Sequence, residues 1–267
     1  MNYLKNLHKN KSLILLPHYD DEIFIFPLLR KLNNCGIETH LLWLTQSGGI
    51  NKELDLKLIQ KRKFESENLL KKTGLTNLNT HHLGLLFEIP DGKLFLEIEK
   101  VEKSIRSKFA PGLWTLITPH WENGHSDHDV TFLLGKILEK EGFGEHYSFP
   151  MYNTKSKFKP FQVMNFEAKE TKIPMRIGKK DRLTFILVPL YFKSQLKAWI
   201  GLYLPIILKT LFRKQIYFFE GKTMSSIYFY NMRLIEKRSK NDTTLYVNRV
   251  IKYCVKNNIP INVSRHL

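Results

Sequence analysis

Between residues 12 and 141, short apolar runs of strand length alternate with longer amphipathic stretches of helix length. The predicted strands are Leu13–Leu16, Thr39–Leu44, His81–Leu85 and Leu113–Thr118, and the predicted helices lie near Pro27–Asn33, Lys52–Thr73, Leu94–Phe109 and His128–Glu141. This alternation is typical of βαβ units, in which a helix connects two parallel strands. The chain is therefore predicted to be an α/β protein with a mostly parallel sheet.

Finer features of these elements are also predicted. Pro27 suits the first turn of its helix, because its missing N–H has no partner to lose there. The apolar face of the second helix is expected to comprise Leu54, Leu58, Phe64, Leu69 and Leu70. Beyond residue 150 the pattern is less regular, and we expect a C-terminal α+β portion. It would include a strand over Ser226–Leu234, a helix around Val247–Val255 capped by Asp242, and a last strand over Ile259–Val263.

The first predicted strand ends in a dense group of ionisable residues, Pro17-His18-Tyr19-Asp20-Asp21-Glu22. Because His18 and Asp21 are three residues apart, one tight turn could direct both side chains at one metal ion. Asp20 lies between them and is free for another role. The alternative is that His18 is structural and that the acids cap and charge the first turn of a helix. Taken alone, this motif leaves both interpretations open.

A second polar cluster, Gly124-His125-Ser126-Asp127-His128, follows the predicted strand Leu113–Thr118. Neighbouring parallel strands would bring the two clusters together at the carboxyl edge of the sheet, where open α/β folds bind their ligands. Two histidines and one carboxylate, with an open position for water, form a common catalytic zinc site.

Together the two motifs resemble the His-Pro-Asp-Asp-Glu and His-Pro-Asp-His motifs of the PIG-L/LmbE family of zinc-dependent N-acetylglucosaminyl deacetylases. Their order and separation along the chain also fit that family. The resemblance covers about the first 150 residues and implies a Rossmann-like three-layer sandwich. We expect residues 1–267 to form one domain of this kind, with a core over about 12–150 and an extension over about 151–267.

The resemblance supports a metal site of His18, Asp21 and His128, which would hold Zn²⁺, and Fe²⁺ fits the same ligands. It implies that Asp20 is the catalytic base and that His125 assists catalysis, as a donor to the tetrahedral oxyanion. We expect Asp127 to fix the tautomer of His125, as a carboxylate next to a histidine does.

Three further positions follow from the comparison of motifs. Glu22 is interpreted as a supporting or capping acid outside the ligand set. Tyr19 and Ser126 replace the prolines of the two family motifs, which leaves ligation intact but changes the loops. The prolyl rings carry no chemistry, so we expect their replacement to affect the rigidity of the loops and the shape of the pocket.

Arg62 and Glu65 lie at i and i+3 of the second predicted helix. They could form a surface ion pair of little energetic value. Alternatively, the family has an Arg-x-x-Glu helix whose Arg faces the substrate, which implies a substrate-binding role for Arg62. Tyr191, Ser194 and Gln195 resemble a Tyr-x-Ser-Gln segment of a later helix in the family.

The predicted function is hydrolysis of the N-acetyl group from an N-acetylated amino sugar, linked to a nucleotide, a lipid or a glycan, with release of acetate. One alternative is a metal-dependent amidase that acts on a non-sugar amide. Another is a basic protein that binds nucleic acid or anionic lipid without turnover. This last class accounts for the net charge of +17, but not for the spacing of the histidines and acids.

Charge and cysteine content predict the partners and the compartment. The net charge of +17 predicts affinity for polyanions, namely nucleic acid, anionic membrane or phosphorylated substrates. Because a nucleic-acid-binding role does not account for the two motifs, a phosphorylated or lipid-linked substrate is expected, and nucleic acid is not. Nine basic residues and one acid occur over 176–214, interleaved with aromatic and aliphatic residues. This pattern is typical of a membrane-surface helix or of a core helix whose lysines extend into solvent. Cys35 and Cys254 are the only cysteines, so we expect a cytoplasmic protein, with the inner face of the membrane as a second possibility.

Overall fold

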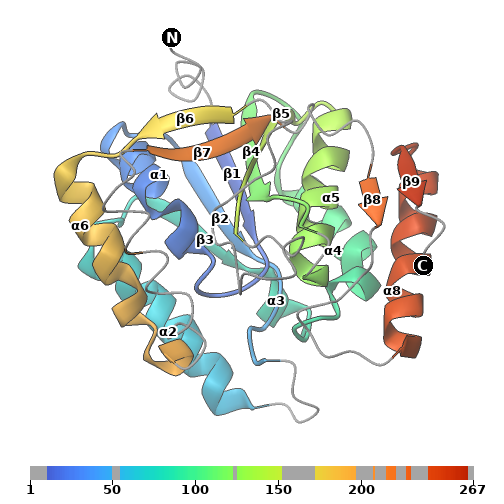
Figure 1. The fold of residues 1–267 in the computed structure, drawn as a ribbon, viewed down its shortest axis with the longest axis horizontal. Coiled ribbons are helices and arrows are strands. Elements are labelled where there is room, and N and C mark those ends of the chain that lie inside the picture. The colour runs from blue at the N-terminus through green and yellow to red at the C-terminus, as the bar shows by residue number, and fades with distance from the viewer. Residues whose placement is uncertain are drawn as a thin grey trace.

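The computed structural model describes residues 11–49, 55–122, 125–151, 172–196, 207, 215–220, 227–229 and 240–263. Its main feature is a seven-stranded sheet in the order β3-β2-β1-β4-β5-β7-β6 (Figure 1). The strands are β1 Lys11–Leu16, β2 Thr39–Trp43, β3 Leu78–His82, β4 Trp114–Pro119, β5 Gly144–Phe149, β6 Lys172–Arg176 and β7 Gln215–Glu220. Strands β1 to β5 are parallel, whereas β7 runs antiparallel to both β5 and β6. The predicted α/β fold with a mostly parallel sheet is confirmed.

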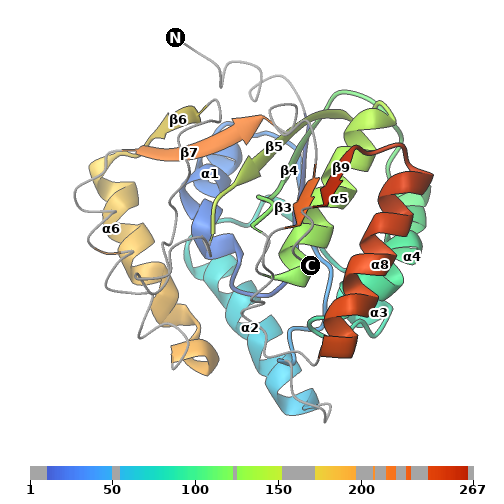
Figure 2. The same cartoon turned by 45° about the vertical axis from the view of Figure 1, so that its right-hand side comes forward.

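Helices cover both faces of this sheet. They are α1 Glu22–Asn34, α2 Leu56–Lys72, α3 Leu83–Leu86, α4 Leu94–Lys108, α5 Ser126–Lys140, α6 Lys179–Leu187 and α8 Lys240–Lys256, with 3₁₀ turns η2 Val188–Tyr191 and η3 Lys193–Gln195. Figures 1 and 2 show α1, α2 and α6 on one face and α4, α5 and α8 on the other. Strands β8 Ile227–Phe229 and β9 Ile261–Val263 form a small parallel pair. Within the described ranges, no helix has the length and apolar character needed to cross a bilayer.

The side chains of β1 alternate between the two helix layers. Leu13 and Leu15 pack in the cluster that contains α4, α5 and α8, whereas Ile14 and Leu16 pack in the cluster that contains α1, α2 and α6. All four are completely buried. Successive strand residues point to opposite faces, so a continuous apolar run belongs in a strand that is covered on both sides.

The strand order puts a topological switch point between β1 and β4. The chain moves outward from β1 to β2 and β3, and then returns to β4 on the other side of β1. The helices that follow the two strands, α1 and α5, lie on opposite faces of the sheet (Figure 1). Such a reversal opens a crevice at the carboxyl ends of the two strands, where α/β proteins bind ligands. Both predicted motifs follow these strand ends.

The first helix differs from its prediction. It begins at Glu22, so Pro27 lies inside α1 rather than in its first turn. The residues from Ile23 to Phe26 are all buried, and a buried loop would leave their backbone polar groups without partners. Helix formation satisfies most of these groups, although the proline ring removes one hydrogen bond.

The second helix and the third strand also differ in part. Phe64 is 65% exposed, and the buried face of α2 contains Glu65 and Ser66 in addition to leucines; Leu54 lies outside the described residues. The strand predicted over His81–Leu85 ends at His82, and Leu83–Leu86 forms the short helix α3. Gly84 approaches the backbone of Thr45 so closely that a Cβ atom would lie 2.1 Å from the Thr45 carbonyl oxygen.

Two C-terminal predictions are also corrected. Helix α8 begins at Lys240, so Asp242 lies within the helix rather than capping it. Strand β8 covers three residues of the strand predicted over Ser226–Leu234, and residues 230–234 lie outside the described part of the chain.

Candidate metal centre

The first motif forms a tight loop between β1 and α1. The backbone N–H of His18 donates to Asp21 Oδ2 at 2.8 Å, and the backbone N–H of Tyr19 donates to Ser47 Oγ at 2.7 Å. Asp20 has a φ of +102°, a backbone conformation that costs energy for any residue except glycine. The loop therefore holds His18, Asp20 and Asp21 in a constrained arrangement at the carboxyl edge of the sheet.

Tyr19, which stands where the family motif has proline, is completely buried. Its hydroxyl lies 2.7 Å from Nδ1 of His82 in β3, and its ring packs against Trp43 with the centroids 5.1 Å apart. Nε2 of His82 in turn lies 3.3 Å from Glu67 Oε1 on α2. Hydrogen bonds to neighbouring elements thus hold the loop at the position of the missing prolyl ring.

The second motif lies at the start of α5, with His125 at the N-cap and Asp127 and His128 in the first turn. The rings of His125 and His128 stack with centroids 4.2 Å apart, and the His18 ring lies 4.8 Å and 5.4 Å from them. One nitrogen atom from each histidine lies within 4.8 Å of the other two. The structure therefore brings together the two motifs, which are more than 100 residues apart in the sequence.

Asp21 lies between the histidines of the predicted ligand set. Its Oδ2 lies 3.4 Å from Nδ1 of His18, and its Oδ1 lies 3.7 Å from Nε2 of His128. Ligands that lie about 2 Å from a tetrahedral ion are about 3.3 Å from one another, and each of these two separations is close to that value. All three residues are more than nine-tenths buried. A buried carboxylate needs a cationic partner, and nitrogen and oxygen donors of these types suit zinc or ferrous iron.

Asp127 lies beside His18, whereas the sequence predicted that it would fix the tautomer of His125. Its Oδ2 lies 3.1 Å from Nε2 of His18, and its two oxygens accept the backbone N–H groups of Gly92 and Leu94. Asp127 is completely buried, so these donors determine its position. A carboxylate on one nitrogen of a histidine ligand sets the tautomer and leaves the other nitrogen for a metal. Here that other nitrogen, Nδ1, is the atom next to Asp21.

Sequence reasoning missed Glu122, which holds the equivalent position beside His128. Its Oε2 lies 3.4 Å from Nδ1 of His128, and its Oε1 accepts the backbone N–H of Met151 at 2.7 Å. The side chain is 2% exposed. The only signal in the sequence was an acid in the loop between the fourth strand and the second motif.

Glu22 is completely buried beneath the loop. It accepts hydrogen bonds from the Asp20 backbone, from Trp43 Nε1 and from the Ser66 hydroxyl. Burial raises the pKa of Glu22 to about 7, and the Ser66 and backbone hydrogen bonds oppose this rise. Its contacts agree with the predicted supporting role outside the ligand set.

Burial and neighbouring charges shift the pKa values of the ionisable groups of the centre in different directions. Burial lowers the pKa of His128 well below its ordinary value, and the neighbouring His125 and His18 add to this effect. Burial also acts on His18, but hydrogen bonds with Asp127 and Asp21 outweigh it and raise the pKa of His18. Burial raises the pKa of Asp20, and the charge of Asp21 raises it further.

Arg62 lies at the edge of the centre and is held by protein groups. Its Nη1 donates to the carbonyl oxygen of Ser47 at 2.6 Å, and its Nη2 donates to Gln195 Oε1 at 3.0 Å. Asp91 Oδ2 lies 3.8 Å from Nη1. The charge of Arg62 also acts on Asp20, where it partly opposes the rise in the pKa of that carboxyl. Among the described residues, its Nε is buried without a hydrogen-bond partner.

Glu65 is bound to the same C-terminal segment rather than to Arg62. It accepts hydrogen bonds from the backbone N–H of Ser194, at 3.0 Å, and from the Ser194 hydroxyl. The Arg-x-x-Glu pair therefore docks η3 onto α2. This contact places Ser194 and Gln195 beside Glu65 and Arg62 of α2.

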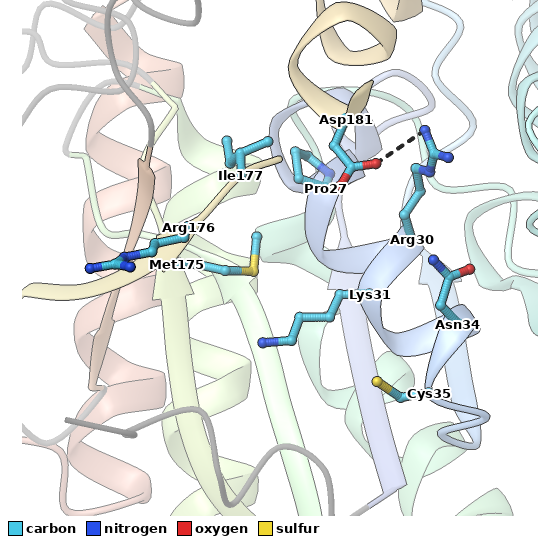
Figure 3. Close-up of a pocket in the computed structure, with 9 residues that line it drawn as sticks. All are labelled: Pro27, Arg30, Lys31, Asn34, Cys35, Met175, Arg176, Ile177 and Asp181. Atoms are coloured by element: carbon cyan, nitrogen blue, oxygen red, sulfur yellow. Dashed lines mark ion pairs between the residues drawn. The ribbon is translucent and has the colours of Figure 1, made fainter. Parts of the chain in front are cut away.

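A separate hollow of about 160 Å³ lies between α1 and β6 (Figure 3). Its lining residues are Pro27, Arg30, Lys31, Asn34, Cys35, Met175, Arg176, Ile177 and Asp181. It adjoins the C-terminal part of α1, whereas the metal centre lies at the N-terminal end of that helix. The hollow is therefore not part of the candidate centre.

The sequence model of the GlcNAc-PI de-N-acetylase family, PIG-L, matches residues 13–137. Residues 13–137 belong to the PIG-L family. This PIG-L region contains β1 to β4, both motifs and most of α5. No curated protein matches the sequence.

Solved structures share the fold of the PIG-L region and extend beyond it. A zinc-inhibited form of teicoplanin deacetylase Orf2 matches with a TM-score of 0.58 and 11% identity, over 79% of this chain and 97% of that one. N,N'-diacetylchitobiose deacetylase from Pyrococcus horikoshii matches with a TM-score of 0.53 and 16% identity, over 87% and 91%. The conserved protein TT1542 from Thermus thermophilus matches with a TM-score of 0.51 and 18% identity, over 76% and 86%. At these identities the matches establish the fold alone.

Proposed function

We propose that this protein is a metal-dependent hydrolase that removes the N-acetyl group from an N-acetylated amino sugar and releases acetate. The observation that carries the proposal is the convergence of His18, Asp21 and His128 where β1 and β4 end. The PIG-L match and the deacetylases among the structural neighbours support the reaction class.

His18, Asp21 and His128 would hold the metal, with zinc as the first expectation and ferrous iron as the second. Asp127 and Glu122 would keep the two imidazoles in the tautomers that ligation needs. A divalent metal bound there would supply Lewis-acid polarisation of an amide carbonyl and a water that is acidic near neutral pH.

The remaining groups would carry out the amide hydrolysis. Asp20 would accept a proton from the water whose oxygen forms a bond to the acetyl carbon. His125 would donate a hydrogen bond to the oxygen that becomes negative in the tetrahedral intermediate. The C–N bond then breaks, the amine nitrogen takes up the proton, and acetate leaves.

The finer assignments concern partners, location and domain structure. We propose that Arg62 contributes to substrate binding and that the substrate is phosphorylated or lipid-linked, because the chain carries a net charge of +17. We also propose a cytoplasmic location, with peripheral membrane contact through the basic residues of 176–214. Since β6 and β7 extend the same sheet as β1 to β5, we infer that residues 1–267 form one domain.

The test is metal content by elemental analysis of protein purified without chelator, with Asp21→Ala beside it. Glu102→Gln is the matched control, because Glu102 is a buried carboxylate on α4 that is not part of the centre. We expect about one zinc or iron per chain in the wild type and the control, and loss of the metal in Asp21→Ala. Absence of metal from the wild type, even after zinc is added back, would overturn the proposal.

An acetate-release screen over N-acetylated sugars then tests the reaction. Release that requires the metal and Asp20 supports N-deacetylation. Release only from non-sugar amides would indicate that the substrate is a non-sugar amide. A metal-loaded protein that releases acetate from neither class would be a binding protein without turnover.

A further inference from the structure

Three leucines on one side of α6 and η2 are exposed to solvent. Leu183 is 62% exposed, Leu187 is 45% exposed and Leu190 is 48% exposed. Positions i, i+4 and i+7 lie on one face of a helix, so these side chains form a continuous apolar stripe, here called the leucine face. The opposite side of the segment is also apolar, since Phe185 and Val188 pack in the core. One side of this segment is therefore buried in the core, whereas the leucine face is left exposed.

The leucine face is attached to the fold at its first end. Nη1 of Arg30 on α1 lies 3.3 Å from Asp181 Oδ1 (Figure 3). The same nitrogen donates a hydrogen bond to the Thr184 hydroxyl at 3.0 Å. At the other end, η3 is bound to α2 through Ser194 and Gln195. The leucines are thus presented on a segment anchored at both ends, and the second anchor adjoins the metal centre.

Cations border the leucine face. Lys179 lies one helical turn before Leu183 on α6, Lys193 follows in η3, and both are exposed. Residues 176–196 contain five basic residues and one acid. An apolar stripe with a basic border complements a surface that has an apolar interior and a negatively charged boundary. A second copy of this chain lacks that complementarity, because each copy carries a net charge of +17.

The sequence that follows continues this composition. Ala198–Leu208 contains no charged residue, and it is preceded by Lys193 and Lys197 and followed by Lys209. Its 11 residues amount to about half the ~20 that a membrane-spanning helix needs.

We propose that the leucine face seats the protein on an anionic phospholipid bilayer. The leucines enter the boundary between headgroups and acyl chains, while Lys179 and Lys193 contact the headgroups. Because η3 connects this face to Arg62, the metal centre is held close to the membrane surface. The binding itself does not depend on the proposed catalytic activity, although the placement of the centre rests on it.

The experiment is co-sedimentation of the full chain with vesicles of phosphatidylcholine, with and without phosphatidylserine. We expect binding to the mixed vesicles that weakens as salt rises, and much weaker binding to phosphatidylcholine alone. The triple substitution Leu183→Ser, Leu187→Ser and Leu190→Ser should weaken binding by at least about tenfold. Leu245→Ser with Val255→Ser is the matched control, because these exposed side chains lie on α8, which covers the other face of the sheet.

Two checks keep the outcomes distinct. Circular dichroism and metal content should match the wild type in every variant, and Lys179→Glu with Lys193→Glu provides a second test that leaves the leucines in place. Equal binding by the triple variant and the wild type, or no binding of the wild type to anionic vesicles, would overturn the proposal. A dimer in solution that the triple variant disrupts would also overturn it. Failure of acetate release in vesicle-free assays would concern the catalytic proposal alone.

Discussion

Replacing Asp127 by asparagine tests whether this residue orients His18, as its contacts indicate, or His125, as the sequence predicted. The carboxylate is completely buried and serves three donors, the backbone N–H groups of Gly92 and Leu94 and Nε2 of His18. Asparagine keeps one acceptor oxygen and turns an NH₂ group toward a donor, so at least one buried N–H group loses its partner. We expect a loss of about 2–3 kcal/mol in the free energy of unfolding.

The same substitution should weaken metal binding. A carboxylate that orients a histidine ligand typically contributes a factor of about 10–100 to metal affinity, which corresponds to ~1.4–2.7 kcal/mol. If Asp127 oriented His125 instead, Asp127→Asn would slow turnover while the affinity for zinc stayed unchanged. Zinc affinity is therefore the measurement that distinguishes the two roles.

The assay is titration of the metal-free protein with zinc against a competing chelator, together with urea unfolding of the same samples. Glu102→Gln is the control, since Glu102 is a buried carboxylate on α4 that accepts hydrogen bonds from Tyr253 and Arg106. It should lose stability but keep its zinc affinity. Wild-type zinc affinity in Asp127→Asn, or an equal loss of affinity in Glu102→Gln, would refute the assignment.

Two further predictions concern stability. Gly84→Ala should destabilise the protein by about 1–3 kcal/mol in urea unfolding, because the new Cβ would overlap the backbone of Thr45. Gly112→Ala is the control and should change stability far less, because a Cβ there meets open space. Equal effects of the two substitutions would contradict the close approach of Gly84 to Thr45. Burial lowers the pKa of His146 to about 3, with Lys136 and His120 adding to the effect, so below pH 6.5 the unfolded chain takes up a proton that the folded chain refuses. Between pH 7 and 5 the wild type should lose about 2 kcal/mol more than His146→Gln, and parallel pH profiles would contradict this.

Much of the fold is visible in local sequence patterns. The apolar runs within β1, β2 and β4, such as Leu13–Leu16 and Leu41–Leu44, are continuous because both faces of these strands are covered. Both motifs could also be recognised, since each places histidines and acids in the segment that follows such a run. Neighbouring parallel strands end at the same edge of a sheet, so the meeting of His18 with His128 could be predicted from their positions.

Element bounds were less predictable where burial outweighs local preference. Pro27 is a helix-start signal in the sequence, yet α1 begins five residues earlier because Ile23 to Phe26 are buried and need their backbone groups paired. Phe64 is apolar but exposed, because the buried side of α2 is occupied partly by Glu65, which binds a segment from the C-terminal part of the chain. The identity of that partner cannot be read from α2 itself.

From its sequence alone, this chain could be assigned an α/β fold, the alternation of its first strands and helices, and the two motifs that supply His18, Asp21 and His128. Only the tertiary structure decided that Asp127 faces His18, that Glu122 faces His128, and that η3 docks on α2. Periodicity and motif spacing report the neighbours of a residue along one element. The direction of a buried side chain depends instead on which donors other elements leave unpaired beside it.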